Sequence, residues 1–400
     1  MTSRQRFLEA MNNRMPDRVP VAPDISTYVP LRRAGLGSRD YWSFGEADQI
    51  PLWQAYLDAA DYFDLDAWIA PVLGLPTVGE AASCEWKHHD KLDTTNDTLV
   101  RTSTIETPDG ALTAMGVCFR GDQAMMIDKP IKDLAADFRK FRHTKPTPAA
   151  LDTKTLETFR RACDERNHAF GVTITYPGFH NWNSYIQGGI EALTYAEMDT
   201  PDILQEWFEW DLERGDRLMN LALQAGLDYI LFGGSGTITL ASPDLAMKYA
   251  IPALKKWSRM ASNAGIPTMI HSCGKNRRLA DLLVEHTDIR MLNPLEPLPL
   301  GDIDLAEVKR TYGCRLAFMG NLHTTDVMLR AAPTLVRQKS LEAVRDAGLG
   351  GGFILSTGDQ CGPGTPDENI FEMVRVANEF GAYPLDMNRI ESEIQRLVSE

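Results

Sequence analysis

The chain alternates short apolar runs with longer stretches of helical periodicity. The runs are rich in Val, Ile, Leu and Phe and have the length of buried strands, and most are followed by a polar loop and an amphipathic stretch. They lie at residues 19–23, 65–70, 170–176, 229–233, 267–271, 289–293, 315–320 and 352–357. Eight strand-loop-helix units predict an α/β fold: a single (β/α)8 TIM barrel with an N-terminal helical segment.

Helix-start residues support the later units of this pattern. Ser242 stands directly before Pro243, which predicts an N-cap with proline in the first turn. Thr365-Pro-Asp-Glu368 has the spacing of a capping box. A doubly wound open sheet is the competing architecture, but no Gly-x-Gly-x-x-Gly follows the first apolar run.

One stretch, from about Cys84 to Arg120, interrupts the alternation. It is rich in Thr, Asp and His, and Pro108-Asp-Gly110 separates two β-like runs. This predicts a β-hairpin insertion after the second strand. In a barrel such an insertion would lie over the catalytic face, so we expect one barrel domain over residues 1–400 that carries this insertion.

Composition narrows the class of partner. With 44% apolar and 24% charged residues in 400, the chain has the composition of a globular protein with a large core. The net charge of −14 argues against nucleic acid or an anionic membrane. No apolar run approaches the roughly 20 residues of a membrane span, and no signal peptide is recognisable. Six cysteines are too few for a disulfide scaffold. We expect a cytoplasmic enzyme.

The most specific chemistry lies in His271-Ser-Cys273, at the end of the fifth apolar run. In an extended segment the two side chains point to the same side, and imidazole with thiolate is a ligand set that suits zinc. Cys361 follows the eighth run, and Glu296 follows the sixth. On a barrel all four would meet at one rim. Glu296 is a further ligand, a carboxylate that supports one, or an exposed loop carboxylate.

Several segments resemble the uroporphyrinogen decarboxylase superfamily. They are Ser3-Arg-Gln-Arg-Phe-Leu-Glu-Ala, Asp17-Arg-Val-Pro20, Tyr185-Ile-Gln-Gly-Gly189, Ser242-Pro-Asp, Gly320-Asn321-Leu322 and residues 362–370. The resemblance covers nearly the whole chain and implies a (β/α)8 barrel. His-x-Cys with a distant Cys is similar to the zinc methyltransferases of this superfamily that act with corrinoid proteins. That branch includes O-demethylases and methylcobamide:coenzyme M methyltransferases, and it implies His271, Cys273 and Cys361 as zinc ligands.

Two further comparisons bear on the site. The barrel of cobalamin-independent methionine synthase is similar in carrying His-x-Cys, then Glu, then Cys on zinc, which favours Glu296 as a ligand. The decarboxylases, in contrast, have an arginine-rich segment where this chain has Asp24-Ile-Ser-Thr-Tyr28, and a His where Cys361 stands. Porphyrinogen decarboxylation is therefore not expected. Tyr185 matches the decarboxylase tyrosine and is either a catalytic residue or part of a scaffold that both branches share.

Other candidate residues follow from their positions after the predicted strands. The loop after the third run is aromatic and polar, and it predicts either stacking on a substrate ring or ordinary packing. His323 could donate a proton to a departing oxygen or cap its helix. Ser235, between glycines, could contact substrate. The predicted substrate-binding residues are Tyr28, Tyr176, Phe179, His180, Trp182, Ser235 and Asn321.

The leading functional hypothesis is a zinc-dependent methyltransferase. It would move a methyl group from a small methylated donor, with methoxyaromatics favoured, to the Co(I) corrinoid (cobalamin) of a separate partner protein, because no corrinoid-binding motif is recognisable in this chain. The alternatives are methyl transfer from methylcobamide to a thiol, a metal-free decarboxylase-like enzyme, and a non-enzymatic zinc protein. A homodimer is a further expectation.

Overall fold

The computed structural model describes residues 1–36, 50–79, 83–119 and 124–399. Its centre is a six-stranded parallel sheet in the order β12-β11-β10-β9-β8-β7. The strands are β7 (Gly171–Thr175), β8 (Tyr229–Gly233), β9 (Thr268–His271), β10 (Met291–Asn293), β11 (Ala317–Leu322) and β12 (Phe353–Thr357). They coincide with the last six predicted runs, and most of their residues are buried, as the continuous apolar pattern requires.

The first two predicted runs do not form continuous strands, so the described residues show six strands of the predicted barrel and not all eight. Val21 makes a single parallel bridge to Leu355 of β12, and Trp68 makes one to Ala169 just before β7. The amide of Asp66 donates to the carbonyl of Val21 at 2.8 Å, which joins the two segments to each other. Proline has no N–H to donate, and the prolines at both ends of 20–23 interrupt the hydrogen-bond ladder there.

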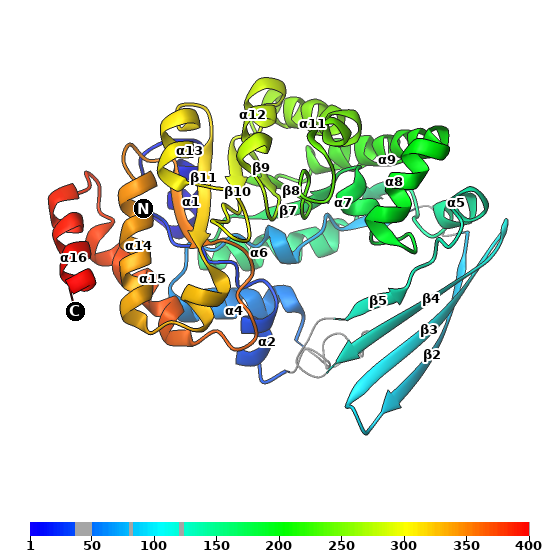
Figure 1. The fold of residues 1–400 in the computed structure, drawn as a ribbon, viewed down its shortest axis with the longest axis horizontal. Coiled ribbons are helices and arrows are strands. Elements are labelled where there is room, and N and C mark those ends of the chain that lie inside the picture. The colour runs from blue at the N-terminus through cyan, green and yellow to red at the C-terminus, as the bar shows by residue number, and fades with distance from the viewer. Residues whose placement is uncertain (37–49, 80–82, 120–123, 400) are drawn as a thin grey trace.

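Helices surround the sheet in Figure 1, and most of them bury apolar side chains. The N-terminal ones are α1 (Ser3–Met11), α2 (Tyr28–Arg33), α4 (Leu52–Phe63), η1 (Ala70–Val72), α5 (Leu134–Arg142), α6 (Thr153–Arg166), α7 (Phe179–Trp182), α8 (Gly189–Asp199) and α9 (Pro201–Ala222). The others are α10 (Pro243–Leu245), the π-helical η2 (Ala246–Ala250), α11 (Ile251–Asn263), α12 (Arg277–His286), α13 (Leu305–Tyr312), the π-helical η3 (Thr324–Leu329), α14 (Pro333–Ala347), α15 (Asp367–Phe380) and α16 (Met387–Ser399). Within the described ranges, none of these helices combines the length and apolar character that crossing a bilayer requires.

Of the two helix starts predicted from the sequence, one forms as expected and the other does not. Ser242 caps α10 by accepting the amide of Leu245 at 3.1 Å, as predicted. The capping box predicted at Thr365 does not form, because α15 begins at Asp367 with Pro366 as its N-cap.

The insertion is larger than the predicted hairpin. The antiparallel strands β2 (Glu85–Asp93), β3 (Thr98–Thr107), β4 (Gly110–Phe119) and β5 (Met125–Asp128) form a four-stranded sheet, separate from the short pair β1 (Thr77–Gly79) and β6 (Pro148–Leu151). Ile105 and Leu112 anchor it against Phe138 and Phe141 of α5. In Figure 1 it extends to one side of the molecule, near α5.

A buried aromatic cluster lies between α7, α9 and η2. Trp182 stacks on Trp207 with ring centroids 5.1 Å apart, and it meets Tyr249 edge-on at the same distance. The indole N–H of Trp182 donates to Asp211 of α9 at 2.7 Å. Burial raises the pKa of Asp211 to about 6, although the Trp182 hydrogen bond and nearby Arg214 act in the opposite direction.

The raised pKa of Asp211 should make the free energy of unfolding depend on pH. Because the pKa of Asp211 is higher in the folded chain, its protonated form favours folding, and that contribution is lost as the pH rises through about 6. Asp211→Asn keeps an acceptor for the indole and should therefore stabilise the fold at pH 7.5 by up to about 3 kcal/mol, with little effect at pH 4. Urea unfolding at both pH values measures this.

The matched control for this prediction is Asp216→Asn. Asp216 also accepts a tryptophan N–H, from Trp257 at 2.9 Å, but it pairs with Lys256 at 2.6 Å. Asp216→Asn should therefore lower the free energy of unfolding at pH 7.5. A gain there for Asp216→Asn as large as that for Asp211→Asn would contradict the assignment to Asp211.

Candidate metal centre

The carboxyl ends of neighbouring strands bring the key side chains to one level. Gly233 of β8, His271 of β9 and Asn293 of β10 are partners in register. This is the edge of a parallel sheet at which ligands bind.

Asn293 fixes which nitrogen of His271 is available. The Nδ2 group of Asn293 donates to the carbonyl of Met319 at 3.2 Å, so its Oδ1 faces His271. That oxygen lies 2.7 Å from Nδ1 of His271 and accepts its proton. Nε2 therefore keeps its lone pair, which is the tautomer that a metal-binding histidine needs.

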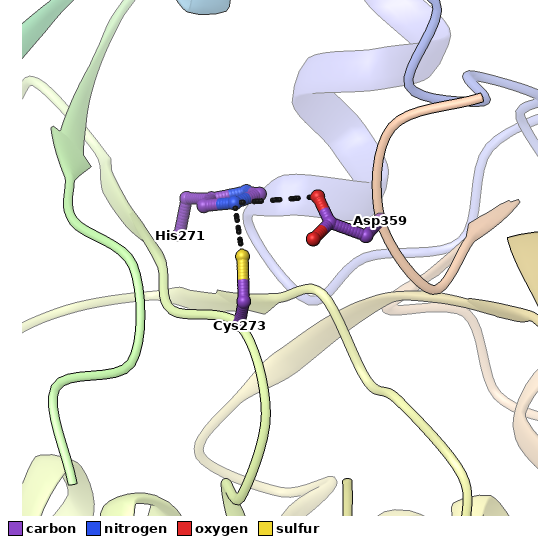
Figure 2. A group of neighbouring side chains, drawn as sticks. All are labelled: His271, Cys273 and Asp359. Carbon is purple, nitrogen blue, oxygen red and sulfur yellow. Dashed lines mark hydrogen bonds and ion pairs between the residues drawn. The ribbon is translucent and has the colours of Figure 1, made fainter. Parts of the chain in front are cut away.

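Nε2 of His271 points at two further candidate ligands, as Figure 2 shows. It lies 3.1 Å from Sγ of Cys273 and 3.8 Å from Oδ1 of Asp359. Asp359 comes from the loop after β12, and in a flat sheet three strand spacings would separate β9 from β12 by about 14 Å. Curvature of the sheet therefore assembles the group.

The donor set and its spacing fit zinc. Within the described part of the chain, His271, Cys273 and Asp359 are the one group of three or more such residues whose ligand atoms all lie within 4.8 Å of one another. Tetrahedral zinc bonds of 2.0–2.3 Å place ligand atoms about 3.3–3.8 Å apart. Imidazole, thiolate and carboxylate are all zinc ligands, and three protein ligands leave one position for a substrate.

Glu296 and Cys361 lie beside this group. Glu296 is buried and accepts the amide of Gly274, so it holds the backbone directly after Cys273. Burial raises the pKa of Glu296. Cys361 is fully buried beside Thr357 and Thr365, outside the group of three, and burial raises the pKa of its thiol to about 12.

A cavity of about 380 Å³ opens directly on this group. Its lining includes His271, Cys273 and Asp359, and Ser235, whose Oγ lies 3.5 Å from Sγ of Cys273. Asp24, only 5% exposed, is also in the wall. Burial raises the pKa of Asp24, the neighbouring Asp359 raises it further, and His271 acts to lower it.

The predicted aromatic loop divides into two parts. Phe179 and Trp182 pack in the buried cluster between α7 and η2 and do not line the cavity. Tyr176 and His180 lie against Gly234, which stands between the lining residues Gly233 and Ser235. A Cβ added to Gly234 would come within 2.8 Å of both side chains. The Tyr176 hydroxyl contacts Oγ1 of Thr237 at 2.6 Å. These two side chains support the loop that carries Ser235.

The remaining predicted residues lie elsewhere. His323 caps η3, with Nδ1 accepting the amides of Thr325 at 3.2 Å and Asp326 at 3.0 Å. With Asn321 it lines a separate cavity of about 330 Å³. Tyr185 accepts a hydrogen bond from Lys145 at 3.1 Å beside α5. Tyr28 begins α2, after the segment that holds Asp24, and is not in the cavity lining.

Asp24, Asn293 and Asp359 were missed by the sequence analysis. A signal existed for Asp359, since it stands two residues before Cys361 and directly after a predicted strand. Asn293 ends a predicted strand, but an isolated asparagine carries no metal pattern. Asp24 becomes visible only when the 20–24 segment is seen beside β12, where its amide donates to Oγ1 of Thr357 at 2.9 Å.

Removal of the Asn293 amide should weaken metal binding without removing a ligand. In Asn293→Ala, His271 loses the acceptor that holds its tautomer, so zinc affinity should fall about 10- to 100-fold. Competition with a chromophoric chelator measures the affinity. Asn293→Asp keeps an acceptor at this position and should retain most of it, whereas equal losses in both variants would contradict the tautomer argument.

The fold and the site together define a parallel α/β protein with a candidate metal centre at its strand ends. Residues 184–380 match the family model described as uroporphyrinogen decarboxylase (URO-D). The chain is 25% identical over 296 residues to the uroporphyrinogen decarboxylase of Synechococcus sp. (strain JA-2-3B'a(2-13)), covering 71% of this chain and 80% of that one. A solved structure of a methyltransferase from Methanosarcina mazei is similar over 95% of this chain and 99% of its own, with a TM-score of 0.63 and 19% identity. These matches confirm the resemblance to the uroporphyrinogen decarboxylase superfamily.

Proposed function

We propose that this protein is a zinc-dependent methyltransferase that moves a methyl group from a small methylated donor to the Co(I) corrinoid of a partner protein. The observation that carries the proposal is the group of His271, Cys273 and Asp359 at the wall of a ligand-sized cavity. The similarity in fold to a methyltransferase is in keeping with it.

Each ligand residue has a distinct task. His271 would bind zinc through Nε2 while Asn293 holds Nδ1, and Cys273 and Asp359 would bring one negative charge each. Zinc, when bound there, supplies a tempered Lewis acid that makes a heteroatom of the donor a better leaving group. Ser235 stands beside Cys273, where its hydroxyl can orient the donor.

The transfer itself balances with one proton from solvent. The bond between the methyl carbon and the heteroatom breaks, and its electron pair stays on the heteroatom, which takes that proton. The electron pair of Co(I) forms the new bond to carbon. His323 does not supply that proton in this arrangement, because its Nδ1 caps η3 and it lines the other cavity.

A decarboxylase activity on porphyrinogens is less compatible with the site. Such substrates carry several carboxylates, which need basic partners. Among the described residues that line the cavity there is no lysine or arginine, while Asp24 and Asp359 face it.

A methyl-transfer screen tests the proposal. The zinc-loaded protein is mixed with free cob(I)alamin and with methoxyaromatics, methyl ethers, methylamines or methyl sulfides, and methylcobalamin is followed by its absorbance. We expect methylcobalamin with at least one donor class. Methylation of thiols by methylcobalamin, with no demethylation of any donor, would instead establish the reverse direction.

A further inference from the structure

Apart from the exposed hydroxyl of Ser235, the two lining side chains that follow turn their hydrogen-bond donors toward the protein. Oγ1 of Thr173 donates to the carbonyl of Ala70 at 2.7 Å. The amide nitrogen of Gln360 donates to Oγ1 of Thr27 at 2.9 Å and to the hydroxyl of Ser26. A ligand in the cavity therefore meets few donors from these side chains.

The charged acceptors in the same wall are the carboxylates of Asp24 and Asp359. Oδ1 of Asp24 accepts the amide of Ser26 at 3.0 Å, and within the described ranges Asp24 forms no ion pair with a lysine or arginine. The ion-pair partner of Asp359 within these ranges is His271, and Oδ1 of Asp359 also accepts the amide of Gln360 at 2.8 Å. A buried carboxylate without a counter-ion is costly, and a cationic ligand would remove that cost.

The charges of the metal centre do not cancel Asp24. A dication held by the thiolate of Cys273, the carboxylate of Asp359 and a neutral imidazole has no net charge. Asp24 then remains as the one carboxyl group of the described lining outside the metal centre, and a cationic ligand beside it would favour its ionised form, which burial disfavours.

We infer that the cavity selects a donor whose non-transferred part carries a positively charged amino group, which Asp24 binds. That the ligand donates a methyl group rests on the proposed function, whereas the preference for a positive charge rests on the cavity wall itself. The ligand is a small aminoalkyl methyl ether or thioether. A methylated compound bearing a carboxylate or sulfonate would meet Asp24 and Asp359 without a basic partner from the described lining.

A matched series of three methyl ethers tests the inference by binding. Methoxyethylamine, methoxyethanol and methoxyacetate share the methyl ether and differ in charge. Titration calorimetry with the metal-loaded protein, in the absence of any corrinoid, gives their dissociation constants. We expect the amine to bind about tenfold more tightly than the alcohol, because a buried charge-assisted hydrogen bond is added, and methoxyacetate to bind most weakly.

Asp24→Asn keeps the shape of the side chain and an acceptor for Ser26. It should lower the affinity for the amine about tenfold, to that of the alcohol. An unchanged affinity for the alcohol shows that the variant is folded, and the exposed control Glu165→Gln should bind all three ligands as the native chain does. The inference is overturned if methoxyacetate binds as tightly as the amine, or if Asp24→Asn leaves the amine affinity unchanged.

The two proposals fail separately. A cavity that prefers the amine in a protein that transfers no methyl group would refute the methyltransferase and keep the inference. Transfer from neutral or anionic donors, with no preference for the amine, would refute the inference and keep the methyltransferase.

Discussion

Cys273→Ser is expected to lower the zinc content of the purified protein from about one ion per chain to near zero. Serine cannot replace the thiolate as a zinc ligand, and two remaining donors from His271 and Asp359 do not form a stable site. Asp359→Asn should also lose most of its zinc, because it removes a ligand charge. Metal analysis after dialysis against a weak chelator measures both.

Cys361→Ser is the control that separates the two possible ligand sets. The resemblance implies Cys361 as a ligand, whereas in the structure Asp359 of the same loop joins His271 and Cys273. We therefore expect Cys361→Ser to keep its zinc. Complete loss in this variant, with full retention in Asp359→Asn, would contradict the structural assignment and favour the ligand set implied by the resemblance.

Asp66→Ala is expected to cost about 3–5 kcal/mol of unfolding free energy, since it leaves the largely buried Arg18 without its carboxylate partner and Arg6 with Asp17 alone. Asp66 is 1% exposed, and its carboxylate pairs with Arg6 at 2.6 Å and Arg18 at 3.0 Å. It also accepts the amide of Val21 at 2.9 Å. This one side chain ties the N-terminal segments to the run at 65–70, where no continuous strand forms.

An exposed ion pair in the same part of the chain provides the control. Glu9 binds Arg14 through both carboxylate oxygens, at 2.6 and 2.7 Å, but the Arg14 side chain is 60% exposed. Glu9→Ala should therefore cost less than about 1 kcal/mol. Urea unfolding of both variants measures the difference, and equal losses would show that Asp66 does not have the structural role proposed.

The sheet was largely predictable because its strands are buried on both faces. A strand such as β12 reads as a continuous apolar run, and β7 to β12 were all anticipated. The runs at 19–23 and 65–70 look the same in sequence, but they form only isolated bridges. Two prolines lack the N–H that a ladder needs, and the amide of Val21 donates to the Asp66 carboxylate. Apolar pattern records burial, and it does not record which amides find a partner strand.

The site was predictable where its residues are close in sequence. His271 and Cys273 are two residues apart, so their spacing alone placed them together. Asp359 and Asp24 depend on how the sheet curves and on which segment lies beside β12, and local sequence does not contain that information. Phe179 and Trp182 were expected near substrate because an aromatic residue that packs in a cluster cannot be distinguished by type from one that stacks on a ligand.

The most direct test of the methyltransferase account is methylcobalamin formation from free cob(I)alamin by the same protein before and after its metal is removed. The account predicts formation with the metal-loaded protein and an active donor, none after stripping, and recovery with about one equivalent of zinc per chain. An equal rate in the stripped protein would contradict it.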